Sequence, residues 1–220
     1  YRGIKAARLS NGDIVVVGEV TFPGGAKQVG LTRRGANGQR IAWPNVDAQY
    51  GHFSSQYILY PNGNTSVPPI YSVHDIKVYG DNIYVLVTGH LSDPDTYAPN
   101  VLRFGTDGSG PGWWFAYDDG GSPVNDAVAM DIYGGKLVVL GRHSLGVTGG
   151  FWTVKWDVES GGGLADATFG DFPAPGSYDR SEPVDIAFRR VGSLVPIGGN
   201  PGYYVLSSRK WSADSANEDF

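Results

Sequence analysis

One pattern of apolar and polar positions recurs four times along the chain. In each copy, alternating apolar and polar residues lead into a turn rich in Gly, Asn or Asp, and a second apolar run follows. The copies are residues 5–17, 74–86, 128–140 and 184–197, with Ile14, Ile83, Leu137 and Leu194 at the same place in each. Such alternation around a turn is typical of a β-hairpin. Repeated β-units predict an array whose members bury their faces by stacking on one another.

Each predicted hairpin is followed by further strand signals. Third strands are predicted at residues 28–32, 100–104, 151–156 and 203–207, and fourth strands at 40–43, 113–117 and 167–169. Four antiparallel strands per repeat make up a propeller blade. We find no stretch of ten residues with helical spacing of apolar positions. Pro196 lies in the second strand of the last copy, where it cannot donate to a ladder.

The third copy carries a more specific signature. Its aromatic strand, residues 151–157, is followed by residues 163–170, in which Leu, Asp, Phe and Gly recur in order. These segments resemble the delta-60 repeat of bacterial exported β-propeller proteins, and residues 135–141 resemble the hairpin of the same family. The resemblance is best in residues 128–170 and weaker in the other copies. It implies a propeller fold and supplies no catalytic residues.

The sequence therefore predicts an all-β protein with one propeller domain of about four blades. The predicted blades are residues 1–70, 71–124, 125–180 and 181–220, with an insertion at 44–70. The last blade would lack its outer strand, and an open sheet edge tends to pair with another strand. We expect a second chain or a further segment of a precursor to complete the ring. The alternative is a small four-bladed ring whose last blade has three strands.

The composition narrows the classes of function. The 220 residues carry a formal net charge of −5 and no basic stretch longer than a pair, so the electrostatic footprint of a nucleic-acid-binding protein is missing. No apolar run approaches the roughly 18 residues of a membrane span. The absence of Cys excludes disulfides and Cys-based sites. Few Lys and many Asn, Gly, Tyr and Trp favour an exported bacterial protein, secreted or at the cell surface. The start at Tyr1 indicates a removed leader or a longer protein.

Candidate binding residues are expected on the propeller face where the second strands end and the blades connect. Equivalent positions after the second strands hold His90 and His143, while matched inner-strand positions hold Asp75 and Asp185. The full set of candidates is His52, His74, Asp75, His90, Trp113, Asp126, His143 and Asp185. One interpretation is a polar pocket that binds a cation or performs acid–base work, with Trp113 stacking on a sugar. The other is that the Asp residues fasten neighbouring blades by accepting backbone N–H groups.

Metal and cofactor signals are weak. The carboxylates of two pairs of residues would suit calcium: Asp93 with Asp95, and Asp118 with Asp119. Neither pair has the full Asp-x-Asp-x-Asp-Gly loop of a calcium site. Ordinary turn residues are the alternative. The sequence has no phosphate loop, dinucleotide fingerprint, Gly-x-Ser-x-Gly elbow or His-Glu-x-x-His pair. Beyond calcium, the sequence identifies no cofactor.

Two hypotheses of function follow. The first is a non-catalytic binding or scaffold propeller that recognises a protein or a glycan through the loops bearing the His and Asp residues. The second is a hydrolase or lyase that acts on a carbohydrate or ester at the acidic mouth of the channel. The fold does not decide between them. Convergence of the His and Asp side chains around an open pocket would favour the enzyme.

Overall fold

The chain is all-β in every part that can be described. The computed structural model describes residues 2–21, 27–43, 70–90, 97–108, 113–116, 125–143, 151–158, 167–172, 179–188, 203–211 and 218–219. All regular elements in these ranges are strands, which confirms the predicted class. The strands are β1 (Arg2–Arg8), β2 (Ile14–Thr21), β3 (Lys27–Arg34), β4 (Arg40–Ile41), β5 (Ile70–Tyr79), β6 (Asn82–His90), β7 (Tyr97–Gly105), β8 (Trp113–Ala116), β9 (Asn125–Tyr133), β10 (Lys136–His143), β11 (Phe151–Asp157), β12 (Ala167–Phe172), β13 (Asp179–Phe188), β14 (Tyr203–Trp211) and β15 (Glu218–Asp219). Among the described residues there is no helix that could span a membrane.

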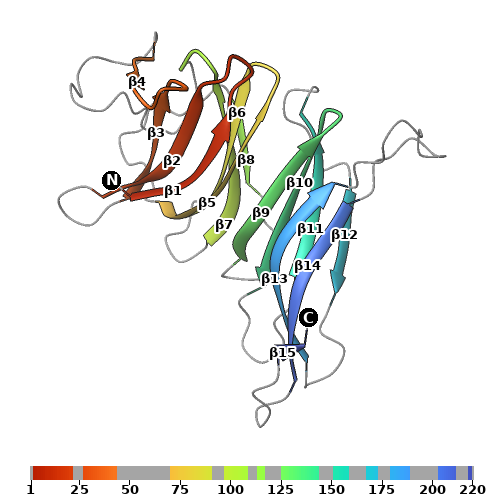
Figure 1. Cartoon of the computed structure of the whole chain (residues 1–220). Helices are drawn as coiled ribbons and strands as arrows, with labels where there is room; N and C mark the ends of the chain where they lie inside the picture. The colour runs from red at the N-terminus through yellow and green to blue at the C-terminus, as the bar shows by residue number, and fades with distance from the viewer. Residues whose placement is uncertain are drawn as a thin grey trace. The chain divides into compact units, whose positions relative to one another are not determined.

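The strands form four antiparallel sheets in which sequence neighbours are also ladder neighbours (Figure 1). The first sheet has the order β1-β2-β3-β4, the second β5-β6-β7-β8, the third β9-β10-β11-β12 and the fourth β13-β14-β15. The tight turns follow from the sequence. Gly80 closes the β5–β6 hairpin with a φ of 57°, and Gly134 and Gly135 close the β9–β10 hairpin with φ of 58° and 75°. Positive φ is easy only for glycine, which explains the Gly-rich turns of the repeat.

The first strand of every sheet carries a β-bulge at the same place. The ladder passes over one residue in each case: Ile4 in β1, His74 in β5, Val128 in β9 and Val184 in β13. The residue after the bulge then faces an apolar residue of the next strand, in the pairs Lys5–Val17, Asp75–Leu86, Ala129–Leu140 and Asp185–Leu206. A bulge bends a strand and increases its twist. The four copies are therefore equivalent in backbone geometry as well as in sequence pattern.

The prediction for the fourth copy was wrong in its strand assignment. The strand predicted as third, within β14, pairs directly with β13, from Phe188 with Tyr203 to Asp179 with Trp211. The predicted second strand, residues 194–197, lies outside the described residues. Strand pairing is non-local, so the sequence pattern alone did not show which later strand would pair with β13. The fourth sheet still contains three strands in its described part, because β15 follows β14.

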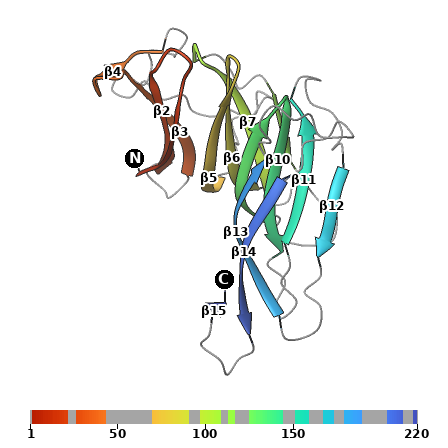
Figure 2. The same cartoon turned by 45° about the vertical axis from the view of Figure 1, so that its right-hand side comes forward.

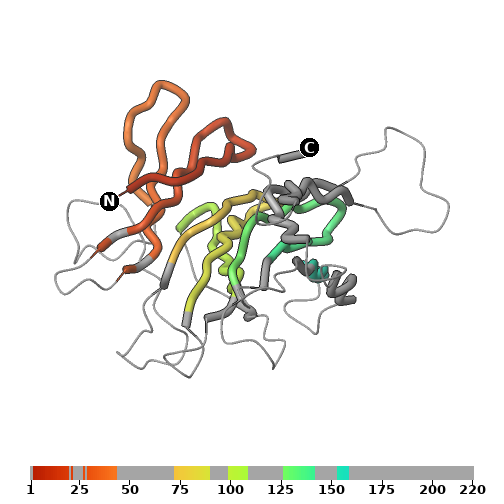
Figure 3. Tube along the Cα trace, turned by 90° about the horizontal axis from the view of Figure 1, so that it is seen from below, coloured from red at the N-terminus to blue at the C-terminus, as the bar shows by residue number. Residues whose placement is uncertain are grey.

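The chain divides into two compact units, residues 1–117 and 118–220, each with two sheets. In the first unit, β5 lies against β1, β2 and β3 of the first sheet, and the two sheets form separate groups of strands in Figure 3. In the second unit, β13 lies against β9, β10 and β11 of the third sheet (Figure 2). Within each unit, the first strand of the later sheet thus packs across the first three strands of the earlier sheet.

The core of the first unit fills the space between its two sheets. It consists of Leu9, Val15, Val17, Val29, Leu31, Trp43, Val73, Ile76, Ile83, Val85, Val87, Leu102 and Phe104. Alternate residues of β2 enter this core, whereas β6 is buried on both faces, since every residue from Ile83 to Gly89 is buried. In the second unit, Leu137 to Leu140 of β10 are also buried on both faces. A central strand covered on both sides must lie between two packed layers.

Candidate functional site

His74 lies among hydroxyl groups on β5 and β6. Its Nε2 is 2.7 Å from Oγ of Ser72 and 2.9 Å from Oγ1 of Thr88. Ser72 and Thr88 are directly opposite each other in the ladder, so they share one face of the second sheet. Thr88 is fully buried, whereas Ser72 and His74 are half-buried. The bulge at His74 brings the imidazole to these two hydroxyls, and we call Ser72, His74 and Thr88 the His74 cluster.

Asp75 is a buried carboxylate held by two lysines and a backbone group. Its side chain is 3% exposed, with Lys5 Nζ at 3.2 Å from Oδ1 and Lys77 Nζ at 3.6 Å from Oδ2. Oδ1 also accepts the N–H of Ile76 at 2.8 Å. A buried charge is costly unless it is paired and hydrogen-bonded. Because Lys5 belongs to β1 and Asp75 to β5, this ion pair fastens the first sheet to the second.

Glu19 provides a second polar link between the same two sheets. Its Oε1 on β2 accepts the N–H of Val73 on β5 at 3.2 Å, and Lys27 lies 3.4 Å from Oε2. Val73 precedes the bulge, where an irregular ladder leaves backbone groups in need of other partners. The sequence analysis did not find Lys5, Lys77 or Glu19. The polar residues around the β5 bulge indicate these contacts only once the strand register is known.

The predicted site residues that follow the second strands lie at matched ends of their sheets. His90 is the last residue of β6, and His143 is the last residue of β10. Asp126 is opposite Arg142, one ladder step from this end of the third sheet. The side chains of His90 and His143 lie outside the described part, so the structure gives their positions along the strands and no contacts.

The other candidates fall in different places. Asp185 follows the bulge of β13, as Asp75 follows that of β5, which confirms that the two positions match. Trp113 begins β8 opposite Arg103. His52 in the insertion and the calcium candidates Asp93, Asp95, Asp118 and Asp119 lie outside the described residues. Among the residues that are described, no group of His, Asp and Glu side chains is arranged to hold a metal ion.

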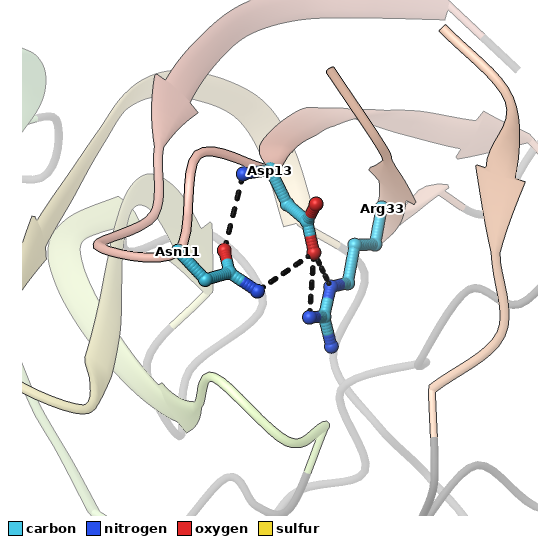
Figure 4. Close-up of polar contacts among 3 residues, drawn as sticks. All are labelled: Asn11, Asp13 and Arg33. Atoms are coloured by element: carbon cyan, nitrogen blue, oxygen red, sulfur yellow. Dashed lines mark hydrogen bonds and ion pairs between the residues drawn. The ribbon is translucent and has the colours of Figure 1, made fainter. Parts of the chain in front are cut away.

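A separate polar cluster stabilises the β1–β2 turn. Oδ2 of Asp13 accepts hydrogen bonds from Arg33 Nε at 2.8 Å and from Asn11 Nδ2 at 2.9 Å, and Arg33 Nη2 is 2.6 Å from it (Figure 4). Asn11 Oδ1 in turn accepts the backbone N–H of Asp13. The hydrogen bond from Arg33 lowers the pKa of Asp13 below its ordinary value, more than burial raises it. The same guanidinium lies 5.8 Å from the centre of the Trp43 ring, a distance suited to a cation–π contact.

Trp43 links the first sheet to the second. It is buried, and a Cβ built on Gly108 of the β7–β8 turn would be 2.8 Å from Trp43 Cβ. Trp43 therefore packs between the first two sheets. Its Nε1 is buried and has no hydrogen-bond partner among the described residues. Trp156 of β11 is also buried, whereas the side chains of Trp152 and Trp211 are not described.

The polar residues of the second sheet have two different roles. A serine hydroxyl in contact with an imidazole is the first pair of a nucleophile and its base. The neighbouring carboxylate, Asp75, is engaged by Lys5, Lys77 and a backbone N–H, so its known contacts are those of a fastening group. The His and Asp candidates of the second sheet thus divide into a hydroxyl–imidazole cluster and a buried ion pair. No protein-family model, curated protein or solved structure matches this chain.

Proposed function

We propose that the four sheets are blades of a β-propeller-like array. The observation that carries this proposal is the repeated geometry: the bulge recurs at one place in all four first strands. The packing within the first unit, with β5 across β1–β3, is also repeated within the second unit, with β13 across β9–β11. Units that use one bulge and one packing mode are what a radial array of blades requires.

For function, we infer an exported bacterial protein that binds a protein or a glycan without catalysis. Rigid β-scaffolds commonly bind through loops at one end of their strands. His90 ends β6 of the second sheet, and His143 ends β10 of the third sheet with Asp126 one ladder step away, which supports a binding role for these equivalent strand ends. The ion pairs of Asp75 with two lysines support a structural role for that carboxylate, as expected for a protein that binds without catalysis. Three further parts of this proposal are supported by the sequence alone. They are a bound calcium ion, a second chain and export from the cell.

A glycan array probed with the labelled chain tests this function. The wild-type chain should bind a subset of glycans, and the double variant His90→Ala/His143→Ala should lose about tenfold or more in affinity for them. Tyr133→Ala is the matched control, because Tyr133 is exposed at the β9–β10 turn, the opposite end of the third sheet from His143. Binding that is unchanged in the double variant would remove the histidines from the site.

The contact between Ser72 and His74 favours one alternative, an ester hydrolase. The 2.7 Å separation of Ser72 Oγ and His74 Nε2 is suited to proton transfer from the hydroxyl during attack on an ester carbonyl. Labelling with a fluorophosphonate probe tests it. Covalent labelling that is lost in Ser72→Ala and kept in Thr88→Ser would support the hydrolase. An unlabelled folded chain would eliminate it.

A further inference from the structure

Two turns of the first sheet contain the same Asn-Gly pair. Asn11–Gly12 lies in the β1–β2 turn, and Asn37–Gly38 lies in the β3–β4 turn. Both glycines have a positive φ, 91° for Gly12 and 79° for Gly38, a region that glycine enters freely. In each pair the asparagine Oδ1 accepts the backbone N–H two residues ahead, at 3.1 Å. The two turns are therefore close structural copies.

An asparagine followed by glycine is chemically labile, because the backbone can attack the side chain. The glycine nitrogen forms a bond to Cγ of the asparagine, and the Cγ–Nδ2 bond breaks. Nδ2 leaves as ammonia together with the proton of the glycine nitrogen. Water then opens the succinimide ring to aspartate or isoaspartate. Because the ring closes only when Cγ reaches the glycine nitrogen, the rate depends on how firmly the fold holds the asparagine side chain.

The two asparagines differ in how the side-chain nitrogen is held. Nδ2 of Asn11 donates to Oδ2 of Asp13 at 2.9 Å, so both ends of this side-chain amide are bonded (Figure 4). Arg33 fixes the same carboxylate oxygen through Nε and Nη2. No described residue accepts a hydrogen bond from Nδ2 of Asn37. Hydrogen bonds to a charged acceptor are stronger than neutral ones, so Asn11 is the more firmly held of the two.

Solvent access also favours reaction at the second pair. Asn37 and Gly38 are both exposed, whereas Gly12 is half-buried. Water is needed both to take the proton from the glycine nitrogen and to open the ring. The exposed pair therefore meets both requirements more easily.

The competing explanation is that the fold protects both pairs to the same extent, because both glycine N–H groups are hydrogen-bonded. Gly12 donates to the carbonyl of Leu9 at 3.0 Å. Gly38 donates to the carbonyl of Gly35 at 2.8 Å. Since these two bonds are alike, they slow both reactions similarly, and the difference between the turns lies in the asparagine side chains.

We propose that Asn37–Gly38 is a site of spontaneous deamidation and that Asp13 protects Asn11–Gly12 from the same reaction. Deamidation of Asn37 adds a carboxylate to an exposed turn in which Arg34 donates to the carbonyl of Gly38 at 3.1 Å. The isoaspartyl product also inserts the Cβ of this residue into the backbone and so lengthens the β3–β4 turn.

Protection of Asn11 preserves a contact that the first sheet uses. Deamidation of Asn11 would place a second carboxylate against Asp13, where the side-chain nitrogen now donates at 2.9 Å. Two carboxylates so close together repel each other when both are ionised. The ion pair between Asp13 and Arg33 would be weakened, and Arg33 also lies over Trp43. The Asp13 hydrogen bond thus links the chemical stability of this turn to its ion pair.

Peptide mapping of the folded chain by mass spectrometry, during incubation at mildly alkaline pH, tests the proposal. Deamidation is detected as the mass gain from replacement of NH2 by OH. It should be faster at Asn37 than at Asn11 by about tenfold or more, because Asn11 must first break its bond to a charged acceptor. In guanidinium chloride the two rates should become similar, since the unfolded chain holds neither side chain. A third Asn-Gly pair, residues 62–63, lies outside the described residues and is followed separately.

The variant Asp13→Ala isolates the contribution of the hydrogen bond. It should raise the rate at Asn11 by about tenfold or more and leave the rate at Asn37 unchanged. Asp81→Ala, at an exposed residue of the β5–β6 turn, is the matched control and should change neither rate. Circular dichroism verifies that both variants fold.

Two results with the wild-type chain would overturn the proposed site: equal rates at the two pairs in the folded chain, or an Asn37 that stays intact while the unfolded chain reacts. An unchanged rate at Asn11 in the Asp13→Ala variant would overturn the protective role of Asp13.

Discussion

At the scale of single residues, one carboxylate joins the first hairpin to the strand that follows it. Asp13 in the β1–β2 turn binds Arg33 of β3 through both Nε and Nη2. Charge-assisted bonds of this paired kind are stronger than neutral ones. Because Arg33 also lies over Trp43, the pair connects the turn to the contact between the first two sheets.

The lowered pKa of Asp13 makes part of the stability depend on pH. A carboxyl whose pKa is lower in the folded state stabilises the fold above its ordinary pKa, and this contribution is lost as the pH falls through the folded value. Asp13→Asn should therefore lower the melting temperature at pH 7 and have little effect at pH 2. The control is Asp81→Asn, a change at an exposed residue of the β5–β6 turn. An equal loss at both pH values would contradict the ion pair.

Gly108 allows Trp43 to approach the second sheet. Gly108 has a φ of 91°, and an added Cβ would meet Trp43 at 2.8 Å. Gly38 is the matched control, with a φ of 79° and nothing within 4 Å of its added Cβ. Gly38→Ala should cost about 1–2 kcal/mol of unfolding free energy from backbone strain alone. Gly108→Ala should cost about 1–3 kcal/mol more because of overpacking. Urea unfolding measures both, and equal losses would contradict the close contact with Trp43.

At the scale of elements, equivalent positions of β2 and β6 differ in what covers them. Ile83 is fully buried in the core, whereas Ile14 is exposed. Ile83→Ala should lower the unfolding free energy by about 2–5 kcal/mol, because it leaves a cavity between packed sheets. Ile14→Ala should cost less than about 1 kcal/mol, because Ile14 is exposed. Similar losses in chemical unfolding would contradict the difference in burial.

The hairpins were predictable because their signals are local. Alternation around Tyr79–Asn82 and Tyr133–Lys136, with glycine in the turns, indicates both the strands and their pairing. The pairing of β13 with β14 was not predictable in the same way, because it joins residues on either side of segment 189–202 and has no local turn signal.

The polar sites were less predictable because they depend on register and bulges. The sequence places His74 beside Asp75, but the bulge directs His74 to Ser72 and Thr88 while Asp75 binds Lys5 of another sheet. Likewise, Arg8, Arg34 and Arg40 are far apart in the sequence and form one row only through two hairpins and a short fourth strand. Pairings between strands are non-local, so composition alone does not reveal them.

At the scale of the whole molecule, the central claim is that neighbouring sheets repeat one packing mode. In the first unit, the face of Val15 and Val17 packs on the face of Ile83 and Val85. The opposite face of β6, with Tyr84 and Leu86, is also buried.

The most direct test is a methyl-resolved NOE spectrum of the chain in solution. The account predicts NOEs between the methyl groups of Val15 and Val17 on β2 and those of Ile83 and Val85 on β6, because these residues belong to one buried cluster of the first unit. Stacked sheets produce these NOEs without any backbone hydrogen bond between the first sheet and the second. Their absence, or a continuous ladder that joins the first and second sheets, would contradict the account.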